Sequence, residues 1–217
     1  MNDTPPQPLP ALAPSERDVR TRNRLLSAAV QVFDRKGYAA TSVREIVELA
    51  GVSKPALYYH FGSKERLLRE ILDDAVREFG KAIRDAIDRP GSTRDRLHAY
   101  AEAFLSAFSA NVPTIRVAHS CFIGPAEAGP TFDFVAFERQ AMAVIERLVQ
   151  EGIATGEIRP ALATDVALAI NGVVEALAAR QLHPGIEPAG PEELRRVLEL
   201  VFDGVMTDRR EQGAHNT

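Results

Sequence analysis

Prolines limit where this chain can form helices. Five of its fourteen prolines lie in the first fourteen residues, and the others stand at positions 55, 90, 113, 125, 130, 160, 184, 188 and 191. Proline disrupts a helix beyond its first turn, so long helices must occupy the stretches between these positions. Those stretches are rich in Ala, Leu, Glu and Arg, and none shows sustained alternation of apolar and polar residues. The sequence therefore predicts an all-α fold.

About nine helices can be placed along the chain. We expect them at about 17–36, after Ser42, after Ser53, from Ser63 toward Asp88, and at about 93–110, 113–122, 132–155, 164–182 and 191–208. A serine with an acidic residue three positions later, as at Ser42 and Ser92, is typical of a helix start. We expect a disordered proline-rich tail at 1–16, a small helical domain at 17–65, a larger one at 66–210 and a disordered tail at 211–217.

Composition excludes several classes of protein. A chain of 217 residues with 45% hydrophobic residues is long enough to bury a core, and Cys121, its only cysteine, excludes a disulfide-stapled fold. The most apolar stretch, 166–179, is interrupted by Asn171 and Glu175 and is shorter than the roughly 18 to 20 residues that cross a bilayer. The N-terminus lacks the pattern of a secretion signal. We expect a cytoplasmic protein without a membrane partner.

Charge is distributed unevenly along the chain. Residues 16–70 contain eleven Lys and Arg against seven Asp and Glu, which gives this segment a net charge of +4. Because the whole chain has a net charge of −4, the remaining residues together carry −8. A basic segment on an acidic body indicates that this one segment meets an anion.

Residues 37–65 have the pattern of two short helices joined by a tight turn. Gly37 follows the end of the first predicted helix, where a left-handed residue is favoured. Gly51 permits the turn between the short helices, and Val52 can fill the corner. Ser53 is expected to cap the next helix, and Pro55 falls in its first turn, where the backbone N–H groups have no helical partner. This is the helix-turn-helix arrangement.

The second of these helices is too polar to serve as core alone. Leu57 and Phe61, four residues apart, can anchor its inner face. The side chains left on the outside or along the rim are those of Lys54, Ala56, Tyr58, Tyr59 and His60. Cationic and aromatic side chains on an exposed helix are typical of contacts with phosphates and base edges in a major groove, although either tyrosine could also be partly packed.

The stretch from about Thr21 to Leu72 closely resembles the DNA-binding domain of TetR-type (tetracycline-repressor-like) transcriptional regulators. The matching residues are Ala28-Ala29, Phe33, Gly37-Tyr38, Thr41-Ser42-Val43, Glu45-Ile46, Ala50-Gly51-Val52-Ser53, Leu57-Tyr58-Tyr59-His60-Phe61 and Ser63-Lys64-Glu65. The resemblance covers about a quarter of the chain. It implies that the helix after Ser53 reads the groove and that the start of the following helix touches the DNA backbone.

The resemblance also implies roles for individual residues. The groove or phosphate contacts would come from Lys54, Tyr58, Tyr59 and His60, and the phosphate anchors would be Thr41, Ser42, Arg44 and Lys64. Ser53 begins the reading helix, and Pro55 and Ala56 occupy positions that face the bases. Because the side chains of Pro55 and Ala56 offer no hydrogen-bonding group, they limit direct readout there.

For the remaining chain the resemblance implies a domain that binds a small effector and two last helices that form a homodimer. The sequence offers two apolar stripes for that interface, Val166, Ile170, Val173, Val174 and Leu177, then Leu194, Val197, Leu198, Val201 and Val205. Two stripes from each of two chains would make a four-helix interface, although the same residues could be internal core.

Six of the ten phenylalanines fall between positions 104 and 137, which favours an apolar pocket. The candidate pocket residues are Phe104, Phe108, Phe122, Phe134 and Phe137, with His98, Arg116 and His119 as polar groups that orient a ligand. For each phenylalanine taken singly, ordinary core packing is the better explanation. The loop between Gly124-Pro125 and Gly129-Pro130 is a candidate lid.

No pattern in the sequence indicates catalysis or metal binding. The chain has no glycine-rich phosphate loop, nucleophile elbow or set of Cys and His at zinc spacing, so we expect no catalytic residue, metal or cofactor and interpret Cys121 as a buried apolar residue. The sequence predicts a repressor that binds a near-palindromic operator of double-stranded DNA as a homodimer and is released by an apolar or aromatic effector. Two alternatives stay open: a helical small-molecule-binding protein or enzyme that no longer reads DNA, and a DNA-binding protein with a vestigial pocket that responds to a protein partner.

Overall fold

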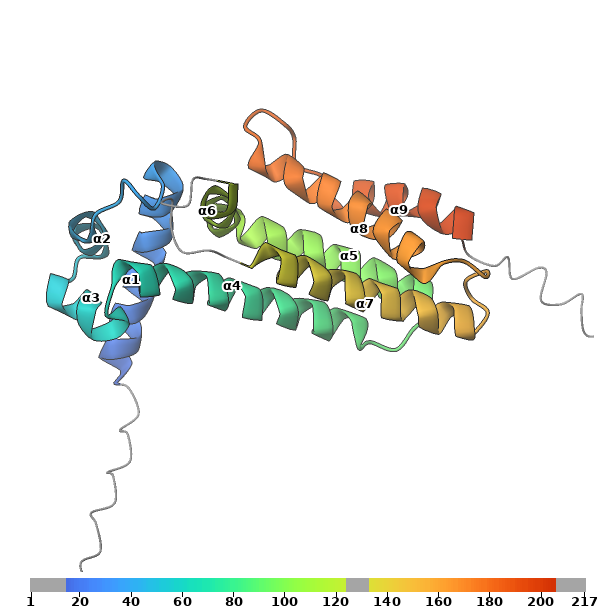
Figure 1. Cartoon of the computed structure of the whole chain (residues 1–217), viewed down its shortest axis with the longest axis horizontal. Helices are drawn as coiled ribbons and strands as arrows, with labels where there is room; N and C mark the ends of the chain where they lie inside the picture. The colour runs from blue at the N-terminus through green and yellow to red at the C-terminus, as the bar shows by residue number, and fades with distance from the viewer. Residues whose placement is uncertain (1–14, 124–132, 206–217) are drawn as a thin grey trace, which may run out of the picture.

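The computed structural model describes residues 15–123 and 133–205, which form nine α-helices and one short 3-10 helix without a β-strand in those ranges (Figure 1). The helices are α1 (Glu16–Lys36), α2 (Val43–Ala50), α3 (Lys54–Phe61), α4 (Lys64–Ile87), α5 (Thr93–Ala110), α6 (Val112–Ile123), α7 (Phe134–Ala154), α8 (Ala163–Ala179), η2 (Arg180–Leu182) and α9 (Pro191–Val205). The all-α prediction is confirmed.

Serine side chains cap the start of four described helices. Ser15, Ser42 and Ser92 each form a capping box with an acidic residue three positions later, and the Ser63 side chain accepts a hydrogen bond from the Arg66 backbone N–H. Ser53 occupies the N-cap position of α3, as predicted. Its side chain makes no capping hydrogen bond, so the predicted side-chain cap is wrong.

Most helix bounds match the prediction within one or two residues. The segment predicted as helix at 164–182 ends as the 3-10 helix η2, and α1 begins at Glu16, so the predicted N-terminal tail extends too far. The candidate lid at 124–130, the tail at 211–217 and most of the N-terminal tail lie outside the described residues.

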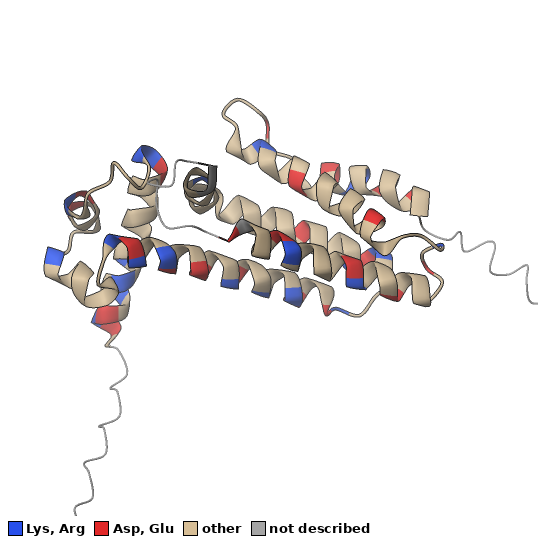
Figure 2. Ribbon diagram, viewed as in Figure 1, with Lys and Arg blue, Asp and Glu red and all other residues tan. Residues whose placement is uncertain are grey.

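The basic segment forms one end of an elongated molecule. Helices α1, α2 and α3 pack together at the left of Figure 1, and α4 runs from them along the lower edge of the larger helical body. Figure 2 marks the Lys and Arg positions in blue along the ribbon of this end, including the start of α3. The helical body continues through α5 and α7 to α8 and α9, which lie side by side along the opposite edge (Figure 1).

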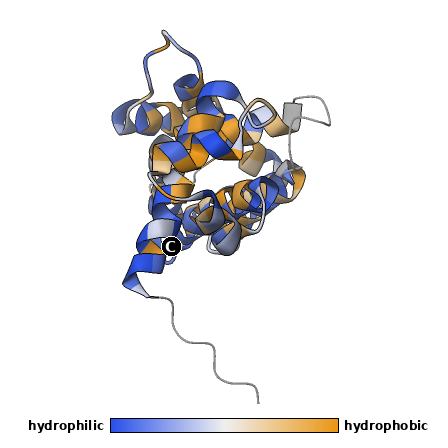
Figure 3. Cartoon of the chain, turned by 90° about the vertical axis from the view of Figure 1, so that its left-hand side faces the viewer, coloured by the Kyte–Doolittle hydropathy of each residue, from blue (hydrophilic) through white to orange (hydrophobic). Residues whose placement is uncertain are grey.

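Two hydrophobic cores share α4. The first core joins α1, α2, α3 and the first half of α4, with Leu25, Ile46, Leu57 and Leu68 fully buried. The second core lies in the helical body and includes Phe79 from the second half of α4. Figure 3 shows the hydrophobic stretches of the helices turned toward the inside. One continuous helix therefore contributes to both cores.

Helix α6 is a second connection between the cores. Its residues Val117, Ala118 and Cys121 are buried in the first core, although they lie more than fifty positions beyond α3 in the sequence. Burial of Cys121 confirms its interpretation as an apolar core residue, and burial raises the pKa of its thiol. Arg116 of α6 donates two hydrogen bonds of 2.7 and 2.6 Å to the carboxylate of Asp34 in α1.

No described helix has both the length and the apolar character that a bilayer crossing requires.

Candidate DNA-binding interface and effector pocket

Helices α2 and α3 cross at a turn that depends on Gly51. This residue has a φ of 60° and a ψ of 41°, the left-handed region that favours glycine, and its N–H bonds back to the end of α2. The Val52 N–H donates to the Val47 carbonyl at 3.0 Å and closes the turn. On the inner side, Leu57 and Phe61 of α3 are buried in the first core, as the sequence predicts.

The outer side of α3 carries the cationic and aromatic side chains. Tyr59 is 77% exposed and Tyr58 is 46% exposed, so both rings are accessible from outside. Lys54 and Pro55 are exposed as well, and the Lys54 Nζ lies 6.0 Å from the centre of the Tyr58 ring. The remaining α3 residues of the predicted contact set, Ala56 and His60, are half-buried.

Two of the predicted phosphate anchors are exposed at the start of α2. Arg44 points into solvent with 84% of its side chain exposed, and its Nε lies 2.6 Å from the Glu48 carboxylate one turn away. Ser42 is exposed too, but its hydroxyl already accepts a hydrogen bond from the Glu45 backbone and donates to the Glu45 carboxylate. Both residues remain accessible to a phosphate.

Of the other two predicted anchors, Thr41 is buried, which corrects its assignment, whereas Lys64 is half-buried and its phosphate contact stays a prediction. Thr41 is 3% exposed, and its hydroxyl donates to the Gly37 carbonyl at 2.7 Å. The Lys64 Nζ donates to the carbonyls of Tyr38 and Thr41 at 2.8 and 2.7 Å and lies 4.2 Å from the centre of the Tyr38 ring. Burial lowers the pKa of Lys64. The two hydrogen bonds of Lys64 fasten the start of α4 to the loop before α2, and the Thr41 hydroxyl closes that loop on itself.

Helix α1 contributes arginines that the sequence analysis did not assign. Arg20 and Arg24 are exposed and line a cleft between α1 and α2, and the Arg24 Nη2 donates to the Gly51 carbonyl at 3.2 Å. Their i, i+4 spacing places both on one helix face, which was the available signal.

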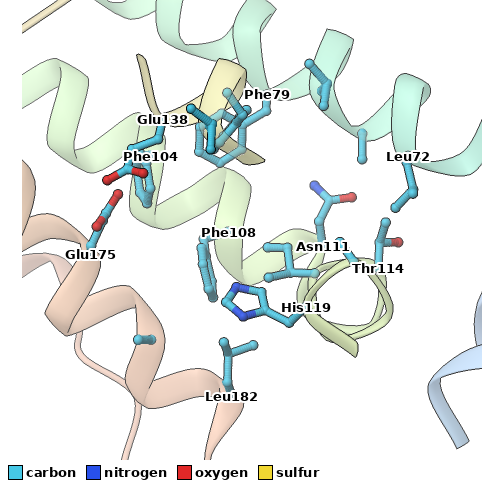
Figure 4. Close-up of a pocket in the computed structure, with 17 residues that line it drawn as sticks. Leu72, Phe79, Phe104, Phe108, Asn111, Thr114, His119, Glu138, Glu175 and Leu182 are labelled. Carbon is cyan, nitrogen blue, oxygen red and sulfur yellow. The ribbon is translucent and has the colours of Figure 1, made fainter. Parts of the chain in front are cut away.

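A cavity of about 370 Å³ lies in the helical body, within the range of small-molecule sites. Its lining residues come from α4, α5, α6, α7, α8 and η2: Leu72, Ala75, Val76, Phe79, Phe104, Phe108, Asn111, Thr114, Ile115, Ala118, His119, Val135, Phe137, Glu138, Glu175, Ala179 and Leu182. Figure 4 shows the labelled members of this set. The structure therefore brings together four of the predicted pocket residues, Phe104, Phe108, His119 and Phe137.

The aromatic rings of the pocket contact one another. Phe79 meets Phe104 edge to face at a centroid distance of 4.8 Å and meets Phe137 at 5.3 Å. Phe104 stacks on Phe108 at 6.3 Å. Phe79 lines the cavity but was not assigned to the pocket from the sequence.

Few polar groups enter this apolar lining. Asn111 donates to the Ala107 carbonyl at 2.9 Å, and burial lowers the pKa of His119. Glu138 and Glu175 are acidic lining residues that the sequence analysis did not single out, because surface helices carry many acidic residues and only the packing of α7 against α8 brings these two to the cavity.

Two predicted pocket residues lie elsewhere. Arg116 is bound to Asp34 on α1, as described above, and does not line the cavity. His98 is buried between α5 and α9, where its Nε2 lies 2.7 Å from the Glu199 carboxylate and its ring meets Phe202 edge to face. Burial, together with nearby arginines, lowers the pKa of His98. The side chains of the predicted pocket residues Phe122 and Phe134 lie outside the described part of the structure.

The predicted dimer stripes divide into inner and outer halves. Five of their members are buried in the core of the single chain, which corrects their assignment as interface: Val166, Ile170, Val174, Leu194 and Leu198. The other five are half-buried: Val173, Leu177, Val197, Val201 and Val205. The most exposed apolar residues of α8 and α9 are Leu168, at 63%, and Leu200, at 74%. Exposed Gly172 and Ala176 continue the outward row of α8 from Leu168.

A tight α2–α3 crossing that buries one side of α3 and exposes a lysine and two tyrosines on the other defines a helix-turn-helix DNA-binding protein. Residues 25–71 match the family model described as bacterial regulatory proteins, tetR family. The chain belongs to the TetR family and is a DNA-binding transcriptional regulator.

Relatives cover nearly the whole chain. The repressor DhaR of a Mycobacterium species, strain GP1, is 30% identical over 85% of this chain and 92% of its own. The repressor KstR2 of Mycolicibacterium smegmatis is 28% identical over 98% of both chains. Among solved structures, the TetR family regulator PfmR from Thermus thermophilus is similar, with a TM-score of 0.66 and 26% identity over 83% of this chain and 97% of that one. These relatives regulate transcription, which confirms the prediction of a regulator over an enzyme.

Proposed function

We propose that this chain is a cytoplasmic repressor that binds a near-palindromic operator as a homodimer and leaves it when a small apolar effector fills the helical pocket. The exposed outer side of α3 carries this proposal. Relatives that align along most of their length, KstR2 and DhaR, are named repressors. The activator FasR of Mycolicibacterium smegmatis aligns with only 41% of this chain.

On DNA, α3 would enter the major groove with Lys54, Tyr58 and Tyr59 toward the bases or phosphates. Arg44 and Ser42 at the start of α2 would hold one phosphate strand. Arg20 and Arg24 of α1 would add phosphate contacts beside the turn, because exposed guanidinium groups favour phosphate oxygens. Half-sites about 34–36 Å apart would accept the two subunits of a dimer.

The dimer would form through the outward rows of α8 and α9 rather than through the predicted stripes as a whole. Leu168 and Gly172 on α8 and Val197, Leu200 and Val201 on α9 support this, because exposed apolar residues at helical spacing form four-helix interfaces. A β-carbon added at Gly172 would meet no atom within 4 Å, so the row leaves room for close approach of a partner helix.

Through α4 and α6, effector binding would change the position of the DNA-binding helices α3. Four residues of α4 line the cavity, and α6 contributes Ala118, which also belongs to the first core. The Arg116–Asp34 contact ties α6 to α1. A ligand that binds one orientation of these helices more tightly shifts the population toward it, and a changed spacing of the two α3 helices no longer fits both half-sites.

Selection of genomic fragments by the full-length protein, followed by fluorescence anisotropy on the enriched sequence, tests this function. We expect a two-fold symmetric site and binding that weakens steeply as salt rises. Leu200→Glu should convert the dimer to a monomer in light scattering and weaken operator binding. Leu162→Glu is the matched control, since Leu162 is 72% exposed but lies before α8, and it should change neither measurement. An asymmetric site would refute the near-palindromic operator. A Leu200→Glu variant that remains dimeric would refute the dimer interface on α8 and α9.

A further inference from the structure

The helical cavity is apolar along its walls and acidic at one end. Phe79, Phe104, Phe108 and Phe137 supply the apolar walls. Figure 4 shows the carboxylate groups of Glu138 and Glu175 at the Phe104 end of the cavity, and they come from two different helices, α7 and α8. The ring of Phe104 therefore borders both the apolar walls and the acidic end.

The two carboxylates have no cationic partner within the described ranges. Other acidic side chains of the helical body are paired, as Glu193 is with Arg180 and Glu102 with Arg195. Glu138 and Glu175 take part in no ion pair there, and no Lys or Arg lines the cavity. The sequence 124–132, which follows α6, contains neither Lys nor Arg. The cavity thus offers a ligand negative charge without a compensating cation.

The neighbouring polar groups do not change this balance. Burial lowers the pKa of His119, which favours the neutral imidazole at neutral pH. Tyr100 is fully buried beside Phe104, at a centroid distance of 6.2 Å, and its hydroxyl has no hydrogen-bond partner among the residues described. Burial, with a smaller contribution from Glu175, raises the pKa of Tyr100, so its hydroxyl stays protonated and adds no charge.

We infer that the effector is an apolar molecule, aromatic or aliphatic, that carries a basic amine, with the hydrocarbon between the phenylalanines and the ammonium group at Glu138 and Glu175. This inference rests on the proposed effector function of the cavity. An ammonium group gains from both carboxylates and from the face of an adjacent aromatic ring. Glu138 and Glu175 are both exposed, and a carboxylate or phosphate on the ligand would meet like charge from both of them, which is unfavourable.

Three probes of equal length test the inference: 6-phenylhexylamine, 6-phenylhexan-1-ol and 6-phenylhexanoate. Isothermal titration of the full-length protein should give the amine about fivefold tighter binding than the alcohol, as an ion pair of about 1 kcal/mol predicts, and the carboxylate weaker binding than the alcohol. In the double variant Glu138→Gln, Glu175→Gln the amine should lose this advantage while the affinity for the alcohol stays the same. Glu78→Gln is the matched control, because Glu78 is exposed on α4 and does not line the cavity.

The outcomes separate this inference from the proposed function. Equal binding of the three probes, tighter binding of the carboxylate, or no binding of any probe would overturn the inference. An amine preference that survives in the double variant would overturn the assignment of the two glutamates. Operator binding is measured on the same protein by anisotropy. If the amine binds selectively but does not release the operator, the ligand class stands and the proposed release mechanism fails.

Discussion

Truncation of Lys54 to alanine is the sharpest test of how α3 meets DNA. Lys54 is the first residue of α3 and is exposed, and its ammonium group has no carboxylate partner among the described residues. The Lys54 Nζ lies 6.0 Å from the centre of the Tyr58 ring. Removal of such a side chain changes the free energy of unfolding by no more than about 0.5 kcal/mol. A loss of operator binding would therefore report on the contact itself.

The size of the effect follows from counterion release. Each phosphate contact contributes about −0.9 to the slope of the logarithm of the binding constant against the logarithm of salt concentration, so the loss of one contact in each subunit of a dimer reduces the slope by about 1.8. Between 50 and 200 mM salt, the parent protein should then lose roughly tenfold more affinity than Lys54→Ala does.

Fluorescence anisotropy on the selected operator at four or more salt concentrations measures both slopes. Lys81→Ala is the matched control, because Lys81 is an exposed lysine on α4 that is paired with Asp85 at 2.8 Å and lies outside the α1–α3 end. Its slope should equal that of the parent. An unchanged slope in Lys54→Ala would refute a phosphate contact at this position, and a reduced affinity with an unchanged slope would assign Lys54 to the bases instead.

Three further predictions concern the frame that holds α3. Leu57→Ala, which empties a fully buried site, should lower the free energy of unfolding by about 3 to 5 kcal/mol in urea titrations. Hydrogen bonds from Lys36 and Ser42 lower the pKa of Glu45 to about 2, so the stabilisation that Glu45 provides is present above pH 4.5 and is lost as the pH falls toward 2. In Glu45→Gln the urea midpoint should therefore depend less on pH over that window. An equally steep fall of the midpoint in the variant would contradict the assignment. A double-mutant cycle of Arg116→Ala and Asp34→Asn should give a coupling of about 0.2 to 1 kcal/mol in the same titrations, and zero coupling would show that the two helices are not joined there.

Local sequence was sufficient for the helices and for the reading motif. Proline positions, serine caps and the apolar spacing in each stretch depend on neighbours within one helical turn, so they can be recognised without the fold. Gly51 at φ 60° and the buried pair Leu57 and Phe61 are where the spacing predicts them. The same local pattern carries the resemblance to the TetR family.

Tertiary structure decided which way ambiguous side chains face. The family resemblance implies a phosphate contact for Lys64, yet in the folded chain its ammonium group donates to the carbonyls of Tyr38 and Thr41. Arg116 found Asp34 on α1, across 82 positions of sequence, instead of the pocket. Such partners are invisible in one sequence because they depend on where separate helices meet.

The division of the α8 and α9 stripes has the same cause. Periodicity identifies an apolar face but not its width, and Val174 and Leu198 turned out to be buried by α5 and α7 while Leu168 and Leu200 point outward. Likewise, Glu138 and Glu175 come to one end of the cavity only because α7 packs on α8. The amino-acid sequence by itself determined the helices and the motif that reads DNA. Long-range packing decided the surface that faces a partner chain and the chemistry of the pocket, since both form between helices that are distant in sequence.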